Sequence, residues 1–199
     1  MLITADDEIT RCSWATGPEI NVEYHDREWG RPMTNDRRLL EKVCLEGFQA
    51  GLSWITILRK RESFRSGFAD FDAETVARFG EADVSRLMTD AGIVRHEGKI
   101  RSAINNARRA LDLAGEAGSL AAYFWGWADP VDRPPTEWEP QTATSAAISK
   151  DLKKRGWTFV GPTTIYAFMQ AAGLVNDHAE GCHVREECSR LRATTLAGR

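Results

Sequence analysis

Four side chains with metal-ligand chemistry lie near the two ends of the chain. Twelve residues separate Cys12 from His25, and three separate His178 from Cys182, which places the last two about one helical turn apart. Two thiolates and two imidazoles complete a tetrahedral zinc site without an open position, as in structural sites. We predict one Zn²⁺ that ties the N-terminal segment to the C-terminal segment across the 152 residues between His25 and His178.

The spacing leaves alternatives to this site. His183 and Cys188 are the nearest further residues of ligand type, and the four candidates could also be unrelated. An open coordination position would instead indicate a metal-dependent hydrolase acting on a small molecule. A disulfide framework is not expected, because the polar N-terminus lacks a secretory signal and the chain is expected to be cytoplasmic.

A second group of candidates lies in the N-terminal third of the chain. Glu46 stands near the end of an apolar helical stretch beside small residues, and Tyr24, Trp29 and Trp54 supply aromatic rings. An aromatic ring can serve as a stacking platform for a base. Taken alone, the local sequence favours a solvated glutamate at Glu46 and a place in the core for each aromatic residue, so only their combination suggests a pocket.

The segment 152–164 has the pattern of a helix, a tight hairpin and a second helix. Free backbone N–H groups and the helix dipole at the start of the second helix favour an anion. Thr163 and Thr164 add hydroxyl donors, and the basic run 150–155, which includes Lys154, adds positive charge. We predict that this hairpin binds a DNA phosphate; the alternative is an ordinary corner between two helices.

The net charge of −3 and the pI of about 5.9 argue mildly against nucleic-acid binding. Local charge matters more, because phosphate contacts depend on nearby basic residues. Three short runs are basic: 59–65, 95–109 and 150–155. Each run is compatible with a solvated helix face, and the third is set apart by the hairpin that follows it.

The hydrophobic pattern predicts an all-α fold without paired strands. Apolar residues recur at helical spacing in seven segments: 35–50, 53–66, 72–79, 81–89, 96–113, 145–155 and 162–172. Four of the seven prolines lie in 129–142, which predicts an extended surface loop. We expect residues 1–199 to form one compact helical unit, or two closely packed helical subdomains with the substrate cleft between them.

Six stretches match the motifs of one known family in the expected order: 11–14, 23–30, 44–54, 90–96, 152–164 and 168–178. In them the sequence resembles the 3-methyladenine DNA glycosylase I family, of the helix-hairpin-helix DNA glycosylase superfamily. The resemblance implies base-excision repair by a monofunctional enzyme. This enzyme would hydrolyse the N-glycosidic bond of 3-methyladenine in alkylated double-stranded DNA, releasing the free base and leaving an abasic site.

The resemblance also assigns roles to the candidate residues. It places the structural zinc on Cys12, His25, His178 and Cys182. Four residues fall on the base pocket, with Glu46 and Tyr24 as hydrogen-bonding groups and aromatic rings as its walls: Glu46, Tyr24, Trp54 and Trp29. The expected DNA contacts, from the resemblance and the hairpin, are Gly51, Leu52, Lys154, Gly161, Thr163 and Thr164. The loop with Gly51 and Leu52 would enter the gap left by the flipped nucleotide.

The chemistry of 3-methyladenine is consistent with this pocket. A methyl group at N3 makes adenine cationic, and the base leaves as a neutral molecule, so the enzyme need not protonate it. The Glu46 carboxylate can accept from the exocyclic amine and its charge favours a cation, while Trp54 can stack through cation–π attraction. Glu46 is therefore the recognition residue and the candidate catalytic residue, and the resemblance implies that the catalytic aspartate of the wider superfamily is absent.

Some features depart from the family. Asn21 stands where a second tyrosine is common, residues 115–142 match nothing recognisable, and the tail after Cys182 is longer and more charged. We expect a monomer with no nucleotide cofactor and no membrane segment. A zinc-containing DNA-binding module without catalytic activity is the competing interpretation, and Glu46, Tyr24 and Trp54 argue against it.

Overall fold

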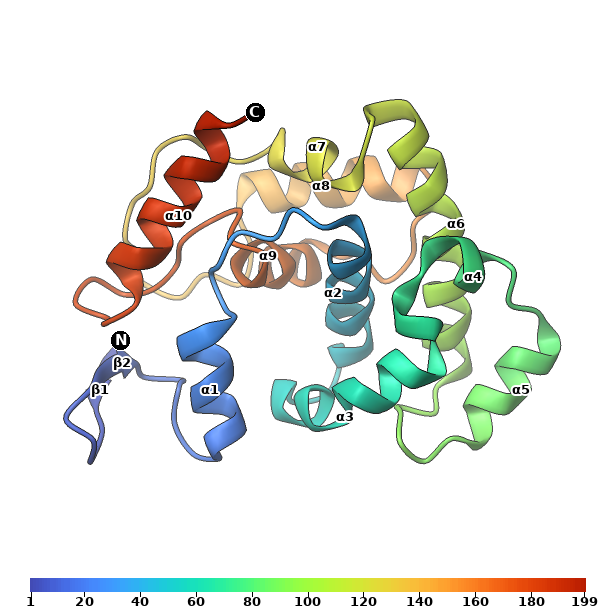
Figure 1. Ribbon diagram of the computed structural model, residues 1–199, viewed down its shortest axis with the longest axis horizontal. Helices are drawn as coiled ribbons and strands as arrows, with labels where there is room; N and C mark the ends of the chain where they lie inside the picture. Colours follow the sequence, from blue (N-terminus) through green and yellow to red (C-terminus); the bar gives the residue numbers. More distant parts are fainter.

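The computed structural model describes residues 1–199 and is mostly helical (Figure 1). Its helices are α1 (Glu19–Arg27), α2 (Asp36–Gln49), α3 (Trp54–Gly67), the 3-10 helix η1 (Ala69–Phe71), α4 (Ala73–Ala77), α5 (Glu81–Thr89), α6 (Glu97–Ala117), α7 (Leu120–Trp125), α8 (Ala143–Lys154), α9 (Pro162–Ala171) and α10 (Arg185–Ala197). No helix combines the length and the apolar composition that a membrane span requires.

The central helix α2 forms where its cap and its apolar spacing predict it. The Asn35 side chain accepts the N–H of Arg38 at 3.1 Å and so caps the first turn. Leu39, Val43 and Phe48 are almost completely buried. They pack α2 against α9, α6 and α3 in the middle of the molecule (Figure 1).

Helices α8 and α9 form the predicted hairpin. Gly156 follows α8 with φ of +84°, a left-handed conformation that glycine adopts without strain, and Pro162 begins α9. Trp157 and Val160 bury their side chains in the turn, and Ser149 Oγ donates to the Val160 carbonyl at 2.6 Å. The hairpin is therefore anchored in the core of the protein.

The prediction of no paired strands is wrong. Strands β1 (Leu2–Thr4) and β2 (Thr10–Cys12) pair antiparallel, with Ile3 opposite Arg11. Each strand has only three residues, too few for an alternating pattern to be visible in the sequence. The sequence pattern also does not predict α1, α7 or α10; the last is charged and buries only Cys188 and Arg192.

The loop 129–142 is extended, as its prolines predict, and helix α10 holds it in place. Arg185 contacts the Asp132 carboxylate at 2.9 Å, and Arg192 donates to the Asp129 carbonyl. The loop leaves α7, passes α10 and returns to α8 (Figure 1). Its backbone path is therefore tied to the C-terminal end of the chain.

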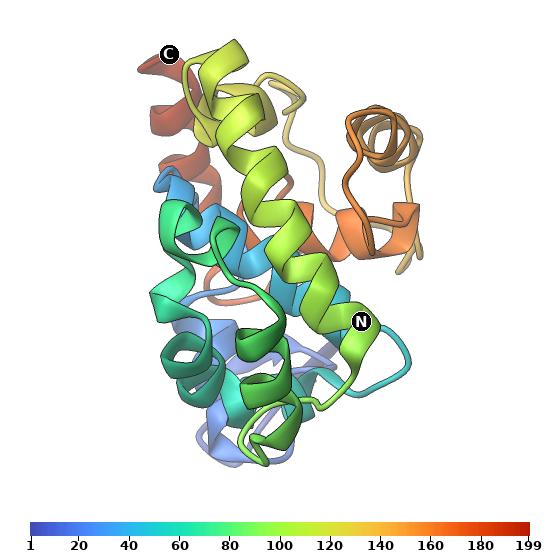
Figure 2. The ribbon, with the colours of Figure 1, turned by 90° about the vertical axis from the view of Figure 1, so that its right-hand side faces the viewer.

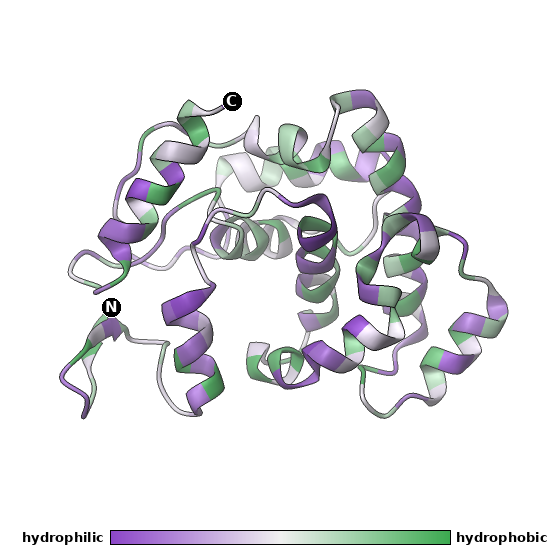
Figure 3. Ribbon diagram, viewed as in Figure 1, coloured by the Kyte–Doolittle hydropathy of each residue, from purple (hydrophilic) through white to green (hydrophobic).

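The buried residues form two clusters. The larger contains 33 residues packed around α2. The smaller contains nine residues, seven of them near the N-terminus and in 179–188, together with Leu58 of α3 and Ala171 of α9. Trp54 packs against both clusters. The long helix α6 crosses one side of the molecule (Figure 2), and the uncharged helix α9 lies inside the fold (Figure 3).

Candidate functional site

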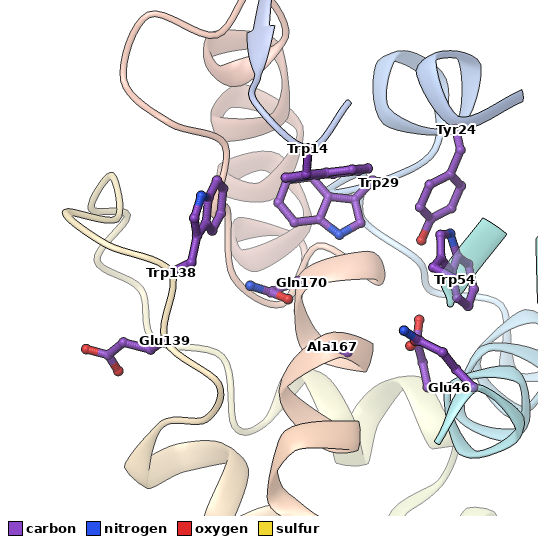
Figure 4. Close-up of a pocket in the computed structure, with 10 residues that line it drawn as sticks. Trp14, Tyr24, Trp29, Glu46, Trp54, Trp138, Glu139, Ala167 and Gln170 are labelled. Atoms are coloured by element: carbon purple, nitrogen blue, oxygen red, sulfur yellow. The ribbon is translucent and has the colours of Figure 1, made fainter. Parts of the chain in front are cut away.

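A cavity of about 280 Å³ opens between the two clusters (Figure 4). Pockets for drug-sized ligands span about 300–1,000 Å³, so this cavity suits a single flat base. Its walls are mainly aromatic and amide side chains, with two carboxylates: Trp14, Tyr24, Trp29, Glu46, Gln49, Trp54, Trp138, Glu139, Ala167 and Gln170. The four residues predicted for the pocket are all among them.

The aromatic walls come from separate elements. Tyr24 lies on α1 and Trp54 begins α3, and their ring centroids are 5.2 Å apart at an interplanar angle of 44°. Trp14 and Trp29 meet edge to face at 4.9 Å. Trp138, from the proline-rich loop, meets Trp29 at 6.4 Å. These rings leave a space bounded by aromatic surfaces, into which a planar ring can stack.

Glu46 is the buried acid of the cavity, with only 5% of its surface exposed. Burial raises the pKa of its carboxyl to about 7, and the charge of Lys42 on the same helix counteracts this rise. Its carboxyl points into the cavity (Figure 4). A cationic ligand would add a second positive charge next to this carboxylate and favour its ionised form.

The four predicted metal ligands meet in one buried cluster. The ligand atoms of Cys12, His25, His178 and Cys182 all lie within 4.8 Å of one another. Cys182 Sγ lies 3.5 Å from His25 Nε2 and 3.7 Å from His178 Nδ1. Tetrahedral zinc with bonds of about 2.0–2.3 Å separates its ligands by roughly 3.3–3.8 Å. The cluster therefore has the donor set and close to the spacing that zinc requires.

The second nitrogen of each histidine also has a partner. His25 Nδ1 lies 2.8 Å from the Asp26 carboxylate, and His178 Nε2 lies 3.1 Å from the Trp29 carbonyl. Such outer contacts orient imidazole ligands. At Gly30, where φ is +77°, a Cβ atom would come within 2.7 Å of His178 Nε2, so this position accepts no side chain without displacing the histidine.

The alternative ligands lie outside the cluster. His183 is exposed, and its Nδ1 lies 3.2 Å from the Thr10 carbonyl. Cys188 is fully buried and belongs to no group of three or more metal-ligating side chains. The predicted set of four ligands is therefore the one that the fold brings together.

The residues predicted to contact DNA lie on two turns. Gly51 has φ of +81°, and its neighbour Leu52 is 42% exposed in the turn between α2 and α3. Lys154 is exposed at the end of α8. Thr163 and Thr164 follow Pro162 in the first turn of α9, where no side chain caps the helix. Their N–H groups find no partner within the protein and can meet an anion.

The hairpin and the cavity share one helix. Gly161 caps α9, and Ala167 and Gln170 on the same helix line the cavity. At a rise of 1.5 Å per residue, the nine steps along the helix from Gly161 to Gln170 span about 14 Å. The arrangement holds the candidate anion site and the base-sized cavity at a fixed distance from each other.

Comparison with known proteins shows which family the chain belongs to. A family model described as methyladenine glycosylase matches residues 14–186. The chain belongs to the methyladenine glycosylase family. It is 49% identical over 177 residues to DNA-3-methyladenine glycosylase 1 of Escherichia coli K12, covering 86% of this chain and 95% of that protein. It is 43% identical over 178 residues to a DNA-3-methyladenine glycosylase of Haemophilus influenzae, covering 87% and 96%.

Solved structures of the methyladenine glycosylase family share the fold. A crystal structure of 3-methyladenine DNA glycosylase I is 46% identical, with a TM-score of 0.83, and the match covers 87% of this chain and 98% of that one. The enzyme from Staphylococcus aureus, described with the structural basis of its 3-methyladenine recognition, is 34% identical with a TM-score of 0.84, covering 88% and 96%. The predicted resemblance is therefore confirmed.

The sequence pattern did not predict several other residues that line the cavity. Gln49, Trp138, Glu139 and Gln170 line it without having been candidates, and Lys42 lies directly behind it. Gln49 follows Glu46 by one helical turn, which is the one signal that could have found it. Of the others, Lys42 comes from α2 and Gln170 from α9. Trp138 and Glu139 come from a loop without recognisable similarity, so only the tertiary fold shows where these residues lie.

Proposed function

We infer that the chain is a DNA-3-methyladenine glycosylase of base-excision repair. It hydrolyses the N-glycosidic bond of 3-methyladenine in alkylated double-stranded DNA, releases the base and leaves an abasic site. The observation that carries this conclusion is the buried Glu46 carboxyl in a cavity walled by Tyr24, Trp29 and Trp54. Its support is the 49% identity to an enzyme named for this activity.

The pocket selects a cationic adenine. The Glu46 carboxylate accepts from the exocyclic amine and attracts the positive charge, while the Trp54 ring stacks on the base. These contacts also stabilise the bound substrate, so only the part that strengthens in the transition state accelerates bond cleavage. Because the base leaves as a neutral molecule, Glu46 acts first in recognition, and its catalytic role is support of the positive charge that develops on the sugar.

Two turns position the DNA around this pocket. Leu52 and Gly51 occupy the gap left when the nucleotide leaves the stack, since Leu52 is an exposed apolar side chain on a tight turn. The free N–H groups of Thr163 and Thr164 bind a backbone phosphate next to Gly161, with Lys154 supplying charge. The protein acts as a monomer, with residues 1–199 forming one unit around the cleft.

The Cys12, His25, His178 and Cys182 cluster holds one zinc ion. The four protein donors complete the coordination, so the ion is structural and supplies folding energy rather than an activated water. Support comes from the donor set, the spacing of the ligand atoms and the close contact that requires glycine at position 30.

The test is to incubate the protein with methylated DNA and to identify the released bases. We expect 3-methyladenine, and its release should fall at least tenfold in the Glu46→Gln variant while the melting temperature is retained. The control is Glu19→Gln, which changes an exposed glutamate at the start of α1. Release of no methylated base by the wild type would contradict the function, and unchanged release by Glu46→Gln would contradict the role of this residue.

A further inference from the structure

Lys42 is a lysine buried behind the pocket. It lies one helical turn before Glu46 on α2, and only 5% of its surface is exposed. Burying an ammonium group is costly unless partners compensate for the lost hydration. An apolar side chain would fill this space without the desolvation cost of an ammonium group. Leu39 and Val43, on the same helix, are buried apolar residues of this kind.

The ammonium contacts two walls of the cavity from behind. Lys42 Nζ donates to the Tyr24 hydroxyl at 3.2 Å. It also lies 4.8 Å from the centroid of the Tyr24 ring and 4.6 Å from that of Trp54, within the range of cation–π attraction. Because the Tyr24 oxygen accepts this hydrogen bond, its own O–H is left to donate toward a ligand.

The same ammonium acts on Glu46 through charge, without a hydrogen bond between them. Lys42 is the one charged group that lowers the pKa of Glu46 against the effect of burial. Burial lowers the pKa of Lys42 itself, and the Glu46 charge counteracts this most strongly. Among the other charges that face it, Glu28 after α1 and Glu41 on α2 favour the protonated form, and Arg61 on α3 opposes it. Across the cavity, helix α9 carries no charged residue, and Glu139 on the proline-rich loop is the other carboxylate of the lining.

We propose that Lys42 is a positioning residue of the base pocket. Its ammonium fixes the Tyr24 hydroxyl and the Trp54 ring, and its charge balances the Glu46 carboxylate. This rests on the proposed function, in which the Glu46 carboxylate must be ionised to bind a cationic base. Lys42 thereby extends the range over which the enzyme works toward lower pH.

The test is the Lys42→Met variant, whose unbranched apolar side chain matches the buried space. Two quantities are measured from pH 5.5 to 9: kcat/KM for release of 3-methyladenine, and the titration of the Glu46 carboxyl by ¹³C NMR, with Glu46→Gln to assign the resonance. Loss of the lysine charge should raise the pKa of Glu46. We expect the acidic limb of kcat/KM and the NMR midpoint to move upward by about one pH unit, a tenfold loss of kcat/KM on that limb.

Two variants separate charge from packing. Lys42→Arg restores the charge and should keep the acidic limb at its wild-type pH. Lys99→Met removes another buried lysine, whose ammonium is bound by the Phe48 and Ala50 carbonyls, and should leave the limb in place whatever it does to stability. If the acidic limb of kcat/KM moved equally in Lys42→Met and Lys42→Arg, the effect of the lysine charge on Glu46 would be refuted.

Circular dichroism checks that Lys42→Met is folded. If the acidic limb and the NMR midpoint of Glu46 both stay at their wild-type pH in the folded variant, the proposal is overturned. The NMR titration needs no catalytic activity. A wild type that releases no base would therefore contradict the proposed function, while the effect of Lys42 on Glu46 would still be measured.

Discussion

Removal of one candidate ligand provides a quantitative test of the proposed zinc site. His178→Ala takes away a ligand that joins the C-terminal segment to Cys12 and His25. Closing a loop of about 150 residues removes roughly 5 kcal/mol of conformational entropy, expressed as free energy, from the unfolded chain. With an unfolding entropy of about 2.1 cal/mol/K per residue, the 199 residues lose about 12 °C in Tm for that amount.

The matched control is His183→Ala. This histidine is exposed, lies five residues further along the chain and is not part of the cluster. Metal content by mass spectrometry and Tm by calorimetry are measured for both variants. We expect one zinc per chain in the wild type and in His183→Ala, and loss of zinc with a Tm lower by about 12 °C in His178→Ala. Equal Tm values for the two variants, or a wild type purified without zinc, would refute the reasoning.

Two further predictions concern DNA. Trp54→Ala removes the stacking ring. Because base–aromatic stacking contributes about 1–3 kcal/mol, kcat/KM for 3-methyladenine should fall roughly 5- to 150-fold without loss of folding. An unchanged kcat/KM would show that the base does not stack on Trp54. Lys154→Ala removes a phosphate contact, so the slope of log K against log salt for DNA binding should become shallower by about 1. Lys60→Ala is the control for Lys154→Ala, because its ammonium is occupied by the Ala91 carbonyl, and the same slope change in both variants would refute a specific role of Lys154.

The metal cluster could be predicted from the sequence because it depends on residue type. Cysteine and histidine are uncommon in this chain, with four of each, so a set of two pairs stands out. The helices with clear boundary residues and apolar spacing were predicted to within a few residues for the same reason, such as α2 after Asn35 and α9 beginning at Pro162. Local signals were sufficient for these helices, whereas the choice among the candidate ligands also depended on the family resemblance, because spacing alone left His183 and Cys188 as alternatives.

Lys42 shows why the rest could not be predicted. It follows Glu41 within a helix, and two adjacent charged residues ordinarily indicate a solvated face. Tyr24 and Trp54, from two other helices, pack over the Lys42 ammonium and help to bury it. Trp138 is similar, because its place in the cavity depends on the path of a loop that crosses the molecule. Such positions follow from long-range contacts, which leave no local pattern.

The anchoring of the 129–142 loop connects the metal cluster to substrate selection. Arg185 donates to the His178 carbonyl at 2.6 Å and to Asp132 at 2.9 Å, so one side chain bridges a metal-ligand residue and the loop that carries Trp138. A disturbance at the Cys/His cluster can therefore reach the cavity wall, although none of its four residues lines the cavity. The C-terminal tail, which contains no pocket residue, thus helps to determine the shape of the space in which the damaged base is inspected.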